Sequence, residues 1–246
     1  MIDIDYSKQK GVADELHWNE FILTAGGEPA AQHNKRQGVK NADYMFPAAR
    51  VIAELKVLET EFAHTRETLE KVDALAEKYP GVHPDDRTKP LRRELLLLIR
   101  KPLQRIINNA NRQIKDTKRE LGLHDWKGII ICVNDGFRSF PPELVRGLLA
   151  HILSKTSYTN TDALIYQTNH FIELPDSPYA HLLWAPMYSD SADNDLVDFV
   201  NDLGRKWNAY TQTKIGPFDV IQERESLDLS QASVVSSPRR NTPYVE

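Results

Sequence analysis

The chain has 246 residues, of which 41% are hydrophobic and 27% are charged. This composition is typical of a folded globular domain and excludes a fibrous or wholly disordered protein. The net charge of −4 argues against a wholly basic nucleic-acid coat protein,. The longest apolar runs, residues 95–99 and 129–133, are far shorter than the roughly 18–20 residues that a membrane span needs,.

The N-terminal part of the sequence predicts a helix and then a loop. Val12, Leu16 and Leu23 recur at helical spacing, which predicts a helix over residues 11–24 with these side chains on one face,. Two consecutive glycines end this helix,. Residues 26–40 have no apolar periodicity, so we expect a loop there.

The next part predicts a β-hairpin. Strand-like runs at residues 42–46 and 50–58 flank the sequence Pro47-Ala48-Ala49, which we interpret as the turn,. A helix over residues 59–78 follows and ends at a Tyr-Pro-Gly sequence,.

Helices and strands alternate through the rest of the chain. A long helical stretch is expected over residues 91–121, in which Pro102 either kinks the helix or starts a second one,. The apolar run GIIICV at residues 128–133 predicts a buried strand,. The other expected elements are helices over 143–153 and 196–207 and strands over 162–167 and 181–187.

This alternation favours an α/β fold in a single domain. We place the domain at residues 1–225, with a helical insertion at about 60–122. The serine-rich segment 226–246 has little to bury and predicts a flexible tail,.

Several common chemistries are excluded by the absence of their motifs. The sequence has no glycine-rich phosphate loop, GxSxG elbow, HExxH pair or CxxC pair,. The single cysteine, Cys132, lies in a predicted apolar strand and is expected to be an inert core thiol,. A single cysteine cannot form an internal disulfide, and the N-terminus has no signal-peptide layout. Both observations favour a cytoplasmic location. Five aspartates between residues 190 and 202 fit the solvated side of a helix better than a metal site,.

The hairpin carries an unusual pair of charges. Side chains alternate along a strand, so Glu54 and Lys56 share one face,. A hairpin centred on Ala48 and Ala49 places Asp43 directly opposite Glu54,. Two facing carboxylates need a compensating cation, and Mg²⁺ is a hard ion that takes carboxylate and phosphate oxygens. The alternative is an exposed hairpin face on which all three side chains are merely solvated.

An aspartate in one strand and Glu-x-Lys in the next, after an N-terminal helix, resembles the PD-(D/E)XK nuclease superfamily. Asp43, Glu54 and Lys56 match its signature at D-x10-E-x-K spacing, with alanine where proline usually precedes the aspartate. The resemblance implies a restriction-endonuclease-like mixed sheet flanked by helices, and Mg²⁺ or its substitute Mn²⁺ held by Asp43 and Glu54. Many members also use a glutamate of the first helix, for which Glu20 is our choice and Glu15 the competing one. We find no clear strand between the first helix and Ala42, where the family has one.

The long helical stretch is also a candidate binding surface. Residues 91–121 carry nine Lys or Arg and three acidic residues in an otherwise acidic chain. On a helical wheel, a basic stripe lies opposite the apolar side and consists of Arg105, Arg112, Lys115 and Arg119,. Such a stripe suits sequence-independent contacts with phosphates, although solvated charges are the usual explanation.

Together, these observations predict a Mg²⁺-dependent nuclease that cuts phosphodiester bonds of nucleic acid, with DNA expected. In this hypothesis, Asp43 and Glu54 bind the metal, Lys56 acts on water and phosphate, and Glu20 assists. The first alternative is a non-catalytic nucleic-acid-binding or scaffold protein that keeps the nuclease fold. The second is a helical interaction subunit that uses the apolar side of residues 91–99. No membrane partner is expected, and a homodimer or larger complex is left open.

Overall fold

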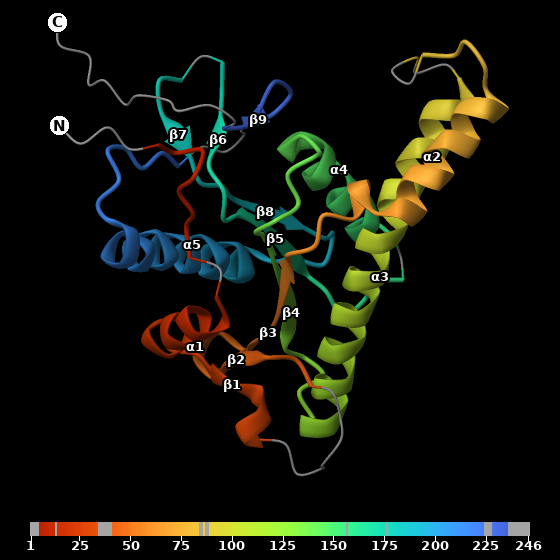
Figure 1. Cartoon of the computed structure of the whole chain (residues 1–246). Coiled ribbons are helices and arrows are strands. Elements are labelled where there is room, and N and C mark those ends of the chain that lie inside the picture. Colours follow the sequence, from red (N-terminus) through yellow and green to blue (C-terminus); the bar gives the residue numbers. More distant parts are fainter. Residues whose placement is uncertain are drawn as a thin grey trace, which may run out of the picture.

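A computed structural model describes residues 5–12, 14–33, 41–83, 86, 89–155, 157–175, 177–223 and 228–235. Figure 1 shows a sheet covered by helices on both faces. The helices are α1 (Glu15–Thr24), α2 (Arg66–Lys78), α3 (Pro90–Leu121), α4 (Pro142–Leu153) and α5 (Asn194–Ile215). The main sheet contains β1 (Glu28–Pro29), β2 (Tyr44–Phe46), β3 (Val51–Leu58), β4 (Lys127–Asn134), β5 (Ala163–Thr168) and β8 (Trp184–Tyr188). A small sheet contains β6 (Ile172–Glu173), β7 (Ala180–His181) and β9 (Ser233–Val234).

The main sheet is mixed, with strand order β1-β2-β3-β4-β5-β8. β1, β2 and β3 are antiparallel neighbours, β3, β4 and β5 are parallel, and β8 returns antiparallel to β5. Parallel neighbours require crossover connections. The α2–α3 pair connects β3 to β4, and α4 connects β4 to β5. The expected α/β class with a mixed sheet is therefore confirmed.

Alternation along β4 explains the three layers. Ile130 and Cys132 pack in one apolar core with α3 and α4. Ile129, Ile131 and Val133 pack in the other core with α1 and α5. Because β4 is buried on both faces, its sequence is a continuous apolar run rather than an alternating one.

The first helix differs from the expectation in its start and its buried face. Asp14 caps α1 at its N-terminus, so the helix begins at Glu15 rather than at residue 11,. Leu16 and Leu23 are 72% and 57% exposed, and the expected inward face is therefore wrong. Val12 lies before the helix, so its spacing to Leu16 and Leu23 does not mark a helical face. The residues that α1 buries are Trp18, Phe21 and Ile22.

A strand lies in part of the segment expected to be a loop. β1 pairs with β2 through Glu28 with Met45 and Pro29 with Tyr44. Two residues are too short to produce a periodic pattern, which is why the sequence did not reveal this strand. The single strand expected over residues 181–187 is also divided, between β7 and β8.

The C-terminal segment is packed where a flexible tail was expected. Leu229, Ala232 and Val235 are buried, and β9 pairs with β6. The prediction is therefore wrong over residues 228–235, because three well-spaced apolar side chains suffice to attach a mostly polar segment. Residues 236–246 lie outside the described part of the chain.

The predicted basic insertion is the crossover itself. α3 is one helix of 32 residues with Pro102 inside it, and its buried side chains pack on the sheet. By contrast, α2 has no buried residue and projects beyond the sheet beside the first turns of α3 (Figure 1). Among the described residues, none of the helices is long and apolar enough to cross a membrane.

Candidate active site

The hairpin register follows the sequence prediction. Tyr44 pairs with Ala53, and Phe46 pairs with Val51, which centres the hairpin on Ala48 and Ala49. A 3-10 turn over Pro47–Ala49 and the left-handed Arg50, at φ 54°, reverse the chain.

Asp43 lies just beyond the last paired residue of β2. Its Oδ2 accepts a hydrogen bond from the Leu55 main-chain N–H at 2.9 Å, so its carboxylate takes the place of a β2 carbonyl beside β3. The neighbouring Ala42 N–H donates to Thr117 Oγ1 of α3 at 2.8 Å. The strand therefore leaves the sheet at Asp43, and a half-buried carboxylate stands at the divergence.

Glu54 is fully buried on the neighbouring strand. It is 0% exposed, and its β4 neighbour is Ile130. The Lys56 ammonium contacts Glu54 Oε1. The other oxygen, Oε2, is buried and has no hydrogen-bond partner in the part of the chain that the structure describes. The structure thus brings Asp43, Glu54 and Lys56 together and excludes a solvated Glu54.

The electrostatics favour a bound cation or proton at this pair. Burial, reinforced by the charge of Asp43, raises the pKa of Glu54 to about 8 despite the opposing effect of Lys56. Burial also raises the pKa of Asp43, although the Leu55 N–H and Lys56 act in the opposite direction. Two carboxyl groups this close resist simultaneous ionisation. A cation between them would take the place of the proton.

The structure does not bring Glu20 to the pair. Glu20 accepts hydrogen bonds from Lys214 Nζ at 2.9 Å and Tyr210 Oη at 2.8 Å, which join α1 to α5. These bonds hold the pKa of Glu20 below its ordinary value. Glu15 is the α1 carboxylate whose charge acts on Asp43, raising its pKa. The competing choice is therefore the better placed one, since α1 buries Trp18, Phe21 and Ile22 rather than the face from which Glu20 was chosen.

The four basic candidates are exposed on α3, on the side opposite its buried apolar residues. Arg119 lies 3.0 Å from Asp116, and Arg112 Nη2 donates to Asn109 at 3.2 Å. Arg105 and Lys115 have no ion pair among the described residues. The stripe faces away from the sheet, whereas Glu54 lies in the sheet. The stripe and the carboxylate pair therefore occupy different layers of the molecule.

The residues set aside on sequence grounds have structural roles. Asp193 caps α5 and pairs with Lys127 at 3.0 Å, and Asp202 pairs with Lys206 at 2.8 Å. Cys132 is fully buried, and burial raises the pKa of its thiol to about 12. Within the described residues, no group of three or more His, Cys, Asp or Glu side chains could hold a metal. A metal at the hairpin would therefore need water or substrate oxygens to complete its coordination.

Comparison with known proteins adds no relative to this picture. No protein-family model matches the chain, and neither a curated protein nor a solved structure is significantly similar to it.

Proposed function

We propose that the protein is a Mg²⁺-dependent nuclease of the PD-(D/E)XK type that hydrolyses phosphodiester bonds of nucleic acid, with DNA as the expected substrate. The observation that carries this proposal is the fully buried Glu54, which faces Asp43 and has one oxygen without a hydrogen-bond partner in the described structure. Lys56 supplies one positive charge for two neighbouring carboxyl groups, and ionising the second one in a buried position is costly,. Such an arrangement is typical of a functional site rather than of a stabilising contact.

The topology supports the resemblance from which the proposal began. β1 supplies a strand between the first helix and Ala42; it pairs antiparallel with β2, which pairs antiparallel with β3. The helical crossover α2–α3 then leads to the parallel strand β4. The Asp and Glu-x-Lys positions fall where β2 diverges from β3, at the one end of the hairpin that main-chain pairing does not close.

The residues present fit Mg²⁺. This ion binds through one or two carboxylates and keeps water or substrate phosphate oxygens in its other positions. Asp43 and Glu54 would hold the ion. Glu54 Oε2, which has no hydrogen-bond partner among the described residues, would become one of its ligands. The chemistry that Mg²⁺ supplies when bound is polarisation of a phosphoryl oxygen.

Lys56 provides the cationic group of the site. Its side chain is 24% exposed, whereas that of Glu54 is fully buried, so its ammonium lies between the buried pair and solvent. In this position it can donate to a phosphate oxygen and orient the attacking water. A preorganised charge of this kind stabilises the negative charge that develops in the transition state.

The test is nicking of supercoiled plasmid by the purified full chain with Mg²⁺ and with EDTA. We expect cleavage with Mg²⁺ alone, and its loss in both Glu54→Gln and Lys56→Ala. Glu20→Gln is the matched control, because Glu20 is bonded to α5, and it should retain wild-type cleavage. Equal cleavage by wild type and Glu54→Gln would refute the assignment of this site.

A second candidate function is nucleic-acid binding without catalysis. The specific observation in its favour is the exposed stripe on α3, which lies in a different layer from the carboxylate pair. Folded wild type that binds DNA or RNA in a salt-dependent manner, yet cleaves neither with Mg²⁺ or Mn²⁺, would replace the nuclease proposal with this one.

A further inference from the structure

A large cavity lies at the edge of the main sheet remote from the carboxylate pair. Its volume is about 790 Å³, which is within the range of roughly 300–1,000 Å³ for small-molecule sites,. β8, the last strand of the sheet order, lines it together with α5, a residue of α4 and the segment 215–223. Three inter-strand spacings of about 4.8 Å separate β3 from β8, so the cavity is roughly 14 Å from the hairpin site.

The cavity follows the unpaired edge of β8, and this edge is unsuited to an added strand. Among the described strands, β8 pairs only with β5. Pro186, in the middle of β8, has no N–H to donate and interrupts any further ladder,. The segment 215–223 also lines the cavity from outside the sheet. These features favour a compact ligand over a peptide strand.

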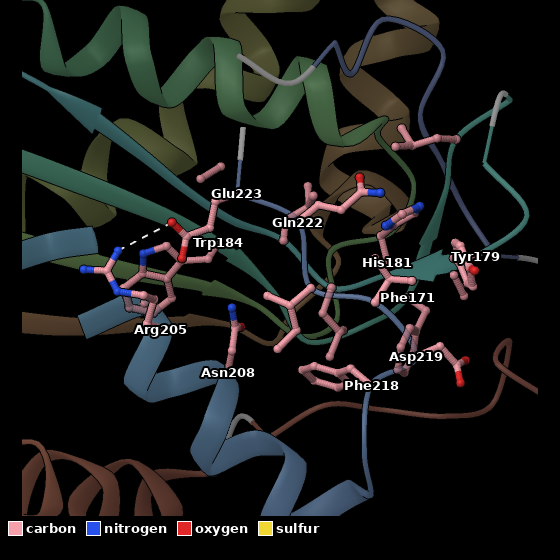
Figure 2. Close-up of a pocket in the computed structure, with 18 of the residues that line it drawn as sticks. Phe171, Tyr179, His181, Trp184, Arg205, Asn208, Phe218, Asp219, Gln222 and Glu223 are labelled. Carbon is pink, nitrogen blue, oxygen red and sulfur yellow. Dashed lines mark hydrogen bonds and ion pairs between the residues drawn. The ribbon is translucent and has the colours of Figure 1, made fainter. Parts of the chain in front are cut away.

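The walls are rich in aromatic rings. Figure 2 shows Phe171, Tyr179, Trp184 and Phe218 around the cavity. The Trp184 ring lies flat against α5 at Gly204, where an added Cβ would come within 2.6 Å of the indole nitrogen. Aromatic rings in the wall of a cavity suit a ligand with a planar or apolar body.

The charged side chains of the cavity are not equivalent. Arg205 lies 3.5 Å from Glu223 and 4.0 Å from Asp202, so its charge is already compensated; the first pair is the dashed line in Figure 2. Asp219 is exposed and has an interaction of its own. Arg146 of α4 is half-buried, and its Nε has no hydrogen-bond partner within the described ranges. It lines the cavity as a cation without an ion pair among the described residues.

From this juxtaposition we infer a second, non-catalytic site: the cavity binds a small amphipathic anion, with an aromatic or other apolar body against the rings and one carboxylate, sulfonate or phosphate group on Arg146. Guanidinium is the side chain best suited to planar recognition of such groups. The anionic group of the ligand pairs with the Arg146 guanidinium, and its apolar body covers apolar surface at the edge of β8. The inference is independent of the nuclease proposal, because no residue is shared between the two sites.

The experiment uses two fluorescent probes that share an aromatic body. 8-Anilinonaphthalene-1-sulfonate carries an anionic group, and N-phenyl-1-naphthylamine is its neutral counterpart. We expect the folded full chain to bind the anionic probe at one saturable site. Arg146→Gln should weaken this binding roughly tenfold or more and change binding of the neutral probe by less than about twofold. Arg146→Lys should restore part of the loss.

Arg205→Gln is the matched control, since Arg205 lines the same cavity but is already paired. It should change binding of either probe by less than about twofold. Each variant is first checked for a wild-type circular dichroism spectrum and a cooperative melt. Three results would each overturn the inference: no saturable binding by wild type, equal loss for both probes in Arg146→Gln, or an equal effect of the Arg205 substitution.

Discussion

Replacing Glu54 by glutamine should change how the stability of the metal-free protein depends on pH. In the folded protein, burial and Asp43 raise the pKa of Glu54 from its ordinary 4.5 to about 8. The folded state therefore holds this proton more tightly than the unfolded state does. It follows that Glu54 lowers the stability of wild type progressively as pH rises from about 4.5 to about 8. Glutamine keeps the shape and cannot ionise, so this loss disappears.

The size of the effect follows from the pKa interval. Each pH unit between the two pKa values contributes about 1.4 kcal/mol. The free energy of unfolding of Glu54→Gln should rise relative to wild type by roughly 5 kcal/mol in full, of which roughly 3–4 kcal/mol falls between about pH 5 and pH 8,. The slope is the diagnostic quantity, because any packing difference between the two side chains shifts the whole curve by a constant.

The assay is urea unfolding in EDTA at pH 5, 6, 7 and 8, with wild type, Glu54→Gln and Glu20→Gln in parallel. Glu20 is the control because its pKa is lowered from its ordinary value of 4.5. Its ionisation therefore changes the stability only at pH values below 4.5,. Its profile should follow that of wild type. Parallel profiles for wild type and Glu54→Gln would show that Glu54 is not a buried, proton-holding carboxyl, and the argument for the site would fail.

Three further results are expected. Asp43→Asn removes the charge facing Glu54, so the melting temperature of this variant in EDTA should exceed that of wild type. Stabilisation of the variant by Mn²⁺ should largely disappear. An undiminished Mn²⁺ shift in melting temperature would contradict the paired site. Arg105→Gln should weaken DNA binding and lower the slope of log binding constant against log salt concentration by about one unit. Arg119→Gln should have a smaller effect, because Arg119 is already paired with Asp116. Filter binding at several salt concentrations measures both effects. Gly128→Ala should destabilise the fold by about 2–4 kcal/mol in urea unfolding, because the added Cβ would lie 2.0 Å from a main-chain oxygen,.

Much of the candidate site could be predicted from the sequence, because it rests on local geometry. The turn residues between two strand-like runs set the centre of the hairpin, and the two-residue period of a strand then put Asp43 opposite Glu54,. The amphipathic pattern of α3 likewise separated its buried Leu103, Ile107 and Ile114 from its basic stripe,. These inferences depend only on neighbours along the chain.

Other features depend on contacts between distant segments and could not be read locally. The buried face of α1 is decided by aromatic packing against α5, where Trp18 stacks on Trp207 with ring centroids 3.9 Å apart. β1 is defined only by its pairing with β2, and residues 228–235 only by their packing on the body of the protein. The cavity likewise exists because segments far apart in the sequence meet around the edge of β8.

The sequence by itself determined the order of the longer helices and strands, the register of the hairpin and the facing of Asp43 and Glu54, because periodicity and turn chemistry act over a few residues. Only the tertiary structure decided that Glu54 is fully buried rather than solvated, that Glu15 rather than Glu20 acts on Asp43, and that Arg146 lines a cavity with its Nε unpaired among the described residues. Burial and charge environment are sums over all neighbours in space, and most of those neighbours lie far away in the sequence.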